Sequence, residues 1–69
     1  MTANIHPTAV VEAGAELGTN VTIGAFAYIG PNAEIHDNAV LRPKATVLGR
    51  TIINESVELF PGAVVGGPP

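Results

Sequence analysis

The sequence predicts an all-β chain that coils as a parallel β-helix, because one six-residue pattern runs through nearly all of it. An aliphatic residue opens every hexad, and we call these residues the openers. The openers are Ile5, Val11, Leu17, Ile23, Ile29, Ile35, Leu41, Val47, Ile53, Leu59 and Val65. The fifth places of the same hexads are mostly small: Ala9, Ala15, Val21, Ala27, Ala33, Ala39, Ala45, Thr51, Val57, Ala63 and Pro69. An unbroken period of six is typical of a β-solenoid.

Each hexad is expected to hold one short strand and one turn. Residues two apart, such as Val21 and Ile23, point to the same side of an extended segment, so the fifth place and the next opener both face inward. Turn formers follow the openers: Gly18, Gly24, Gly30 and Gly66, then Pro7, Pro31, Pro43 and Pro61, then Asn20, Asn32 and Asn38. Glycine and asparagine accept positive φ, and proline presets φ for a turn. With eight glycines and six prolines, no long helix is expected.

Three hexads make one triangular coil, so residues 18 apart should stack, as Ala27 does under Ala45, with strands ~4.8 Å apart. The chain then holds about three and a half coils. Residues 1–4 lack the pattern and are expected to be a disordered lead-in, and residues 5–69 are expected to form the β-helix, a fragment of a longer domain.

Composition excludes several classes of protein. The net charge of −3 argues against a nucleic-acid partner. The absence of cysteine excludes disulfides and thiolate metal sites and favours a cytoplasmic location. No apolar run is long enough for a membrane span, and the first residues lack the features of a signal peptide.

The two histidines are expected to be corner residues without a chemical role. His6 precedes a proline, and His36 takes the second place, which glycine holds in earlier hexads. They are 30 residues apart, not a multiple of 18, so they do not stack. A γ-type carbonic anhydrase shares this architecture, but two unstacked histidines fall short of the three protein ligands of catalytic zinc. No metal or cofactor is therefore expected.

The charged residues offer no better site. Glu16 and Glu34, like Asp37 and Glu55, are 18 apart and should stack as like charges. Such pairs can perform acid–base chemistry, but at exposed corners a solvated acidic face is the preferred interpretation. The bases Arg42, Lys44 and Arg50 are expected to balance that charge, although they could contact a phosphate or an acidic carrier protein. No phosphate-binding loop is present.

Two long segments carry a resemblance to a known family. Residues 5–35, IHPTAVVEAGAELGTNVTIGAFAYIGPNAEI, and residues 40–67, VLRPKATVLGRTIINESVELFPGAVVGG, resemble the hexapeptide-repeat acyltransferases, and within them the bacterial enzymes that acylate UDP-N-acetylglucosamine for lipid A. The IHPTA start, the GAFAYIGPN segment and the FPGAVVGG ending narrow the resemblance most. It implies a left-handed helix, a trimer, and transfer of a hydroxyacyl group from acyl carrier protein to the sugar.

The resemblance also implies that the catalytic residues lie outside this chain. The family's general base, its sugar-nucleotide contacts and its acyl-chain ruler all follow the matched stretch. We therefore expect no catalytic, cofactor-binding, substrate-binding or metal-binding residue here, no activity of the chain by itself, and poor binding of acyl carrier protein and UDP-N-acetylglucosamine. The alternative is a stand-alone structural or trimerisation module without catalytic activity.

One outward column predicts self-association. The places before the openers should face solvent, yet the column Val10, Tyr28, Thr46 and Val64 is largely apolar. The neighbouring column, which contains Phe26 and Lys44, adds an aromatic ring. Burying this stripe against further copies predicts a homotrimer.

Overall fold

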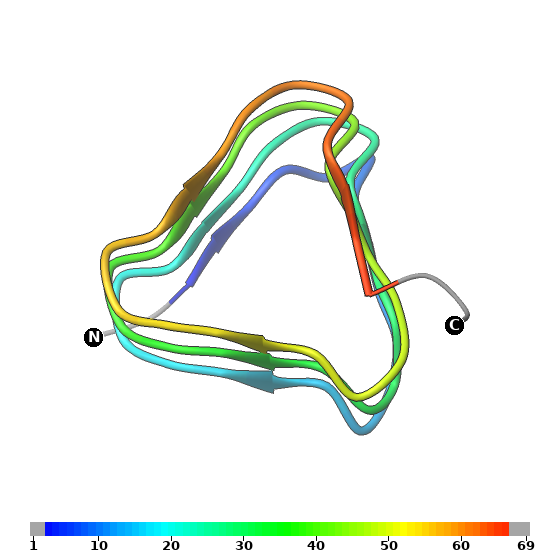
Figure 1. The fold of residues 1–69 in the computed structure, drawn as a ribbon. Coiled ribbons are helices and arrows are strands. Elements are labelled where there is room, and N and C mark those ends of the chain that lie inside the picture. Colours follow the sequence, from blue (N-terminus) through cyan, green and yellow to red (C-terminus); the bar gives the residue numbers. More distant parts are fainter. Residues whose placement is uncertain (1–2, 67–69) are drawn as a thin grey trace.

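The computed structural model describes residues 3–66, which contain eleven two-residue strands and no helix. Each strand consists of an opener and the residue before it. The strands are β1 Asn4–Ile5, β2 Val10–Val11, β3 Glu16–Leu17, β4 Thr22–Ile23, β5 Tyr28–Ile29, β6 Glu34–Ile35, β7 Val40–Leu41, β8 Thr46–Val47, β9 Ile52–Ile53, β10 Glu58–Leu59 and β11 Val64–Val65. The chain winds through them as a stack of triangular coils (Figure 1).

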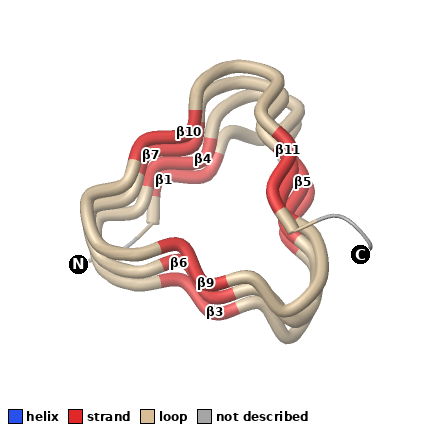
Figure 2. Tube along the Cα trace, in the orientation of Figure 1, coloured by secondary structure: helices blue, strands red, loops and turns tan. Residues whose placement is uncertain are grey.

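Three parallel sheets form the sides of the triangle (Figure 2). Sheet A has the order β1-β4-β7-β10, sheet B the order β11-β8-β5-β2, and sheet C the order β3-β6-β9. The register is 18 residues throughout: Ile5 pairs with Ile23, and Val11 pairs with Ile29. The fold is the predicted left-handed parallel β-helix, with its coils stacked along one axis.

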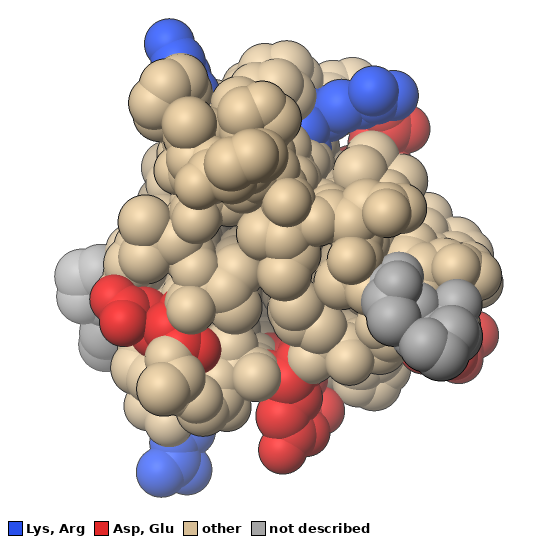
Figure 3. All heavy atoms as spheres, turned by 180° about the vertical axis from the view of Figure 1, so that it is seen from behind, with Lys and Arg blue, Asp and Glu red and all other residues tan. Residues whose placement is uncertain are grey.

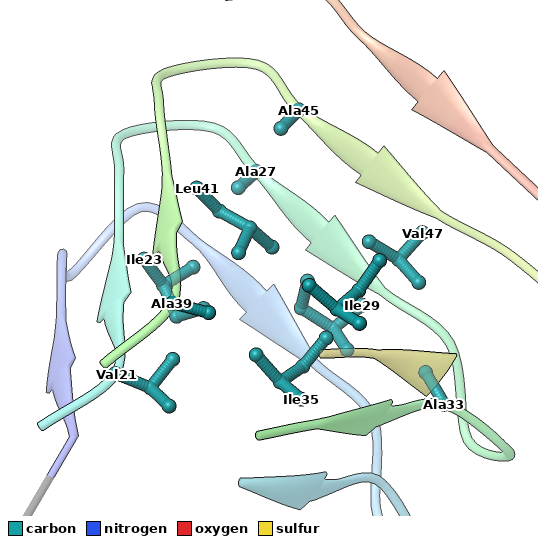
Figure 4. Close-up of a cluster of buried hydrophobic side chains, with 11 residues drawn as sticks. Val21, Ile23, Ala27, Ile29, Ala33, Ile35, Ala39, Leu41, Ala45 and Val47 are labelled. Carbon is teal, nitrogen blue, oxygen red and sulfur yellow. The ribbon is translucent and has the colours of Figure 1, made fainter. Parts of the chain in front are cut away.

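The core is a column of openers and fifth-place residues inside the triangle (Figure 4). Its buried members are Val21, Ile23, Ala27, Ile29, Ala33, Ile35, Ala39, Leu41, Ala45, Val47 and Ile53. Openers in the terminal coils are less covered, and Ile5 is 43% exposed because no coil lies beneath it. The openers Ile23 and Ile29 are buried, as the inward direction of the openers predicts.

The first strand begins earlier than the repeat frame indicates. Asn4, which the sequence places in the lead-in, belongs to β1, and its N–H donates to the carbonyl of Val21 at 2.7 Å. Ala3 packs partly against the core. The rest of the expected lead-in, residues 1–2, and the fifth-place Pro69 lie outside the described residues.

The corners are turns closed by a hydrogen bond from a fifth-place N–H to a second-place carbonyl, as from Ala9 to His6 at 2.9 Å. In seven of these turns within residues 3–66 φ is positive at the fourth place, the arrangement of a type II turn, which accepts proline at the third place as at Pro43 and Pro61. Positive φ at the fourth place occurs at Gly14, Asn20, Phe26, Asn38, Lys44, Ser56 and Gly62. Asn20 and Asn38 confirm the prediction for asparagine, whereas Asn32 is not in this set.

The second-place glycines serve a different purpose from the one predicted. Gly18, Gly24 and Gly30 do not have positive φ; of the predicted set only Gly66 does, at +79°. They are needed because the next coil approaches closely. A Cβ on Gly24 would lie 2.7 Å from the backbone N of Pro43, closer than real Cβ contacts.

Candidate functional site

Four of the six acidic residues line a surface hollow of about 300 Å³ beside β3 and β6. It is lined by Glu16, Leu17, Gly18, Glu34, Ile35, His36, Asp37 and Glu55. Glu16 and Glu34 face each other across the two strands, as the 18-residue spacing predicts. His36 Nε2 lies 3.3 Å from Glu34 Oε1, and both side chains are nearly half exposed.

This hollow has the character of a solvated acidic surface. Asp37 Oδ1 accepts the N–H of Thr19 at 2.8 Å, so its carboxylate holds the corner of the coil below. Within residues 3–66, no group of three or more His, Cys, Asp or Glu side chains is placed to hold a metal ion. The same part of the chain has no helix that could cross a membrane.

His6 stabilises its own corner. Its Nδ1 accepts the N–H of Thr8 at 3.2 Å, and Thr8 Oγ1 in turn accepts the N–H of Phe26, one coil above, at 3.0 Å. The hollow next to it, about 560 Å³, runs along β1 and β4, and no Asp, Glu, Lys or Arg of residues 3–66 lines it. The histidines therefore lie in different hollows and do not act together.

The bases do not all balance the acidic columns. Arg42 donates from Nε and Nη2 to one oxygen of Glu58, each at 2.6 Å. Lys44 and Arg50 form no ion pair with any carboxylate of residues 3–66. Viewed along the coil axis from behind, the charged groups lie towards the rim of the molecule and leave the middle without charge (Figure 3).

Four of the six exposed large hydrophobic residues within residues 3–66 lie on the outer face of sheet B or on the corner that precedes it. We call Val10, Tyr28, Thr46 and Val64 the sheet-B face, and the turns of residues 24–27, 42–45 and 60–63 the aromatic corner. Phe26 and Phe60 are 66% and 68% exposed there, and Val64 is 65% exposed. The sequence pattern did not single out Phe60, whose signal is an aromatic residue in a second place that is held elsewhere by glycine or a polar residue, apart from Leu48.

The pKa of Tyr28, which lies on the sheet-B face, is shifted by a contact with Glu12. Its hydroxyl donates to Glu12 Oε2 at 3.1 Å. This hydrogen bond, with some burial and the negative charge of Glu12, raises the pKa of Tyr28 above its ordinary value. Tyr28 therefore keeps its phenolic proton to a higher pH than an ordinary tyrosine does.

Comparison with known proteins gives consistent results. The profile of bacterial transferase hexapeptide proteins (six repeats) matches residues 14–49. An acyl-(acyl-carrier-protein)–UDP-N-acetylglucosamine O-acyltransferase from Bartonella bacilliformis is 49% identical over 94% of this chain, and one from Rhizobium johnstonii is 50% identical over 97%. The chain covers only 24% and 25% of those two proteins, about a quarter of their length.

Solved structures agree with these relatives. A UDP-N-acetylglucosamine acyltransferase from Campylobacter jejuni superposes with a TM-score of 0.94 at 42% identity, over 96% of this chain and 26% of that protein. The Arabidopsis UDP-N-acetylglucosamine acyltransferase superposes with a TM-score of 0.88 at 40% identity, over 90% of this chain and 22% of that protein.

Proposed function

The chain belongs to the bacterial transferase hexapeptide family, and from this we propose that it forms the first coils of an enzyme that transfers an acyl group from acyl carrier protein to UDP-N-acetylglucosamine. The observation that carries the proposal is 49–50% identity over nearly the whole chain to proteins of that name. The acyl carrier protein and the sugar nucleotide are the substrates of the whole enzyme. Residues 5–69 are then part of one longer β-helix domain.

In this proposal the chain supplies the scaffold, and the remainder of the enzyme supplies the chemistry. His6 and His36, the residues best suited to proton transfer, contact neighbours in their own coils or strands. No residue of the chain is assigned a catalytic, substrate-binding or metal-binding role. A cytoplasmic location accords with the absence of cysteine from all 69 residues.

A chimera tests the scaffold role. The matching quarter of the Rhizobium johnstonii protein is replaced by this chain, and acyl transfer from radiolabelled hydroxyacyl carrier protein is followed. Retained transfer is expected. A control chimera that lacks residues 24–29, one hexad, should lose acyl transfer. Every strand after the deletion would then lie on a different side of the triangle. A folded chimera without transfer would overturn the assignment to this enzyme.

The 69-residue chain alone should not turn over these substrates. Transfer above a no-protein control that survives replacement of both histidines by alanine would show that catalytic residues lie within the chain after all. The same assay therefore separates a scaffold from an active fragment.

The same proposal includes assembly of three copies through the sheet-B face. An isolated prism exposes this apolar stripe to water, and burial against further copies supplies area that a small domain lacks. Sedimentation equilibrium should give a trimer for the wild type and a weakened one for Tyr28→Glu. A wild-type monomer, or a trimer indifferent to Tyr28→Glu, would exclude this face.

A further inference from the structure

We propose that the chain of 69 residues stacks end to end with further copies of itself, so that the first coil of one copy continues the β-helix from the last coil of another. The occupant of each open end is thus a second copy of this chain. The contact is separate from the threefold assembly proposed above, which joins sides rather than ends. A further coil joined after residue 69, as in the longer enzyme, would occupy the same edge, so the stacking belongs to the chain of 69 residues.

The two ends carry complementary backbone groups. Below the last coil, each N–H of a second or sixth place donates to the carbonyl 17 positions later in the coil above, as from His6 to Ile23 at 3.0 Å. Glu58, Phe60 and Val64 hold the same places in the last coil, and no carbonyl of residues 3–66 lies above them to accept their N–H groups. At the other end, the opener carbonyls of the first coil have no donor below them within the same residues. Donors at one end therefore match acceptors at the other, and unpaired strand edges readily take a further chain.

The number of strands determines how one copy lies on the next. Sheets A and B have four strands each, but sheet C has three, so the last coil ends one strand short of a full turn. A second copy that continues the spiral places its β1 on β9, its β2 on β10 and its β3 on β11, and no place is left empty. It is then turned by one side of the triangle. An unturned copy would place its β1 on β10 and leave the space of one strand open above β9.

The side chains at this junction also match. The pairs that face the core are all aliphatic: Ile5 with Ile53, Val11 with Leu59, and Leu17 with Val65. The outward pairs bring no like charges together: Asn4 with Ile52, Val10 with Glu58, and Glu16 with Val64. Ile5 is 43% exposed at its open end, whereas the openers of the middle coils are at most 1% exposed. Stacking therefore removes apolar surface from water at both ends.

Ile5→Lys tests the burial at the junction. In the free chain a lysine at this half-exposed position can extend its ammonium group into water, but between two stacked copies that group would lose its hydration. Sedimentation velocity at rising concentrations should show wild-type species that grow beyond three copies. Ile5→Lys should need about tenfold higher concentration or more to reach the same size. Ile52→Lys is the matched control, because its side chain stays on the outer face of sheet C, and it should stack as the wild type does.

Thermal melts at low concentration check that both lysine variants fold. A folded Ile5→Lys chain that stacks as readily as the wild type would overturn the proposal, and so would wild-type species that stop at three copies or do not grow with concentration. Tyr28→Glu weakens the proposed trimer but leaves both ends intact, so it should not reduce stacking. Failure of the stacking is thereby distinguished from failure of the trimer.

Disulfide trapping tests the register, because the chain has no cysteine of its own. Paired parallel strands lie ~4.8 Å apart, a separation that a disulfide can span. Asn4→Cys and isotope-labelled Ile52→Cys proteins are purified separately, mixed and oxidised, and a mixture of Asn4→Cys with labelled Glu58→Cys reports the unturned copy. Mixed dimers are expected in the first mixture alone. Equal trapping in both mixtures, or trapping in the second alone, would refute the turned register.

Discussion

Gly24 lies beneath the peptide bond that joins Arg42 to Pro43, so close that a Cβ on the glycine would come within 2.7 Å of the Pro43 nitrogen. The contact is backbone against backbone, and neither side can rotate away. Gly24→Ala should therefore lower the free energy of unfolding by about 1–3 kcal/mol, the usual cost of overpacking. Gly30→Ala is the control, because its nearest contact would be 3.3 Å, to Val47 O, and it should cost less. Thermal melts of both variants check the order, and a larger loss for Gly30→Ala would contradict it.

Ile29 is the most informative core position. It is fully buried, with Val11 paired below it and Val47 above it. Ile29→Asp should destabilise the chain by about 3–5 kcal/mol because the new carboxylate has no partner. Glu16→Gln on the outer face should be neutral or slightly stabilising, since it relieves repulsion from Glu34. Equal shifts of the two melting temperatures would mean that the inward assignment is wrong.

Lys44 has a φ of +67° in its turn, a left-handed backbone conformation that is unfavourable for a lysine. Lys44→Asn keeps a side chain but tolerates this geometry better, and it should raise the free energy of unfolding by about 1 kcal/mol. Arg50 occupies the same fourth place of its hexad but does not have positive φ. In that corner the positive φ belongs to Gly49, at the third place. Arg50→Asn should therefore change stability little. Chemical denaturation compares the two, and equal gains would exclude relief of backbone strain as the cause.

The Tyr28–Glu12 hydrogen bond predicts a stability that falls at high pH. The bond raises the folded-state pKa of Tyr28 above the ordinary value near 10 that applies to the unfolded chain. The unfolded chain thus loses its proton first, so the contribution is complete below pH ~10 and is lost as the pH rises through the folded-state value. Phenolate absorbance should titrate later than in free tyrosine, and Glu12→Gln should lower the midpoint. An unchanged midpoint would mean that Glu12 does not act on this hydroxyl.

The period of six was enough to locate every strand and the core, because in a solenoid the inward direction repeats with the sequence. It was not enough to explain why residue 24 must be glycine. The requirement comes from the backbone of Pro43, 19 residues later, which leaves no room for a Cβ. Nor did the period indicate that Phe26 and Lys44 would adopt positive φ, because Thr8, Asn32 and Arg50 stand at the same fourth place without it.

The side-chain partners were harder to predict than the backbone. Tyr28 contacts Glu12 and Arg42 contacts Glu58, and both pairs are 16 residues apart. Each joins a second place to a sixth place on a neighbouring coil, a spacing that a search at 18 residues overlooks. The acidic columns were found because their spacing was 18. They line one hollow together with His36, but no group of three or more such side chains within residues 3–66 is placed to hold a metal ion.

The 18-residue register has a consequence for how such a chain changes length. Removal of one full coil leaves each remaining residue above a residue of the same column, so the sheets reconnect with their hydrogen bonds intact. Loss of a single hexad keeps the openers inward but turns every later residue by one side of the triangle. Side chains that form one continuous outer face before the deletion would then lie on different sides of the triangle. Gains and losses of sequence in this architecture should accordingly be accepted in whole coils during its divergence.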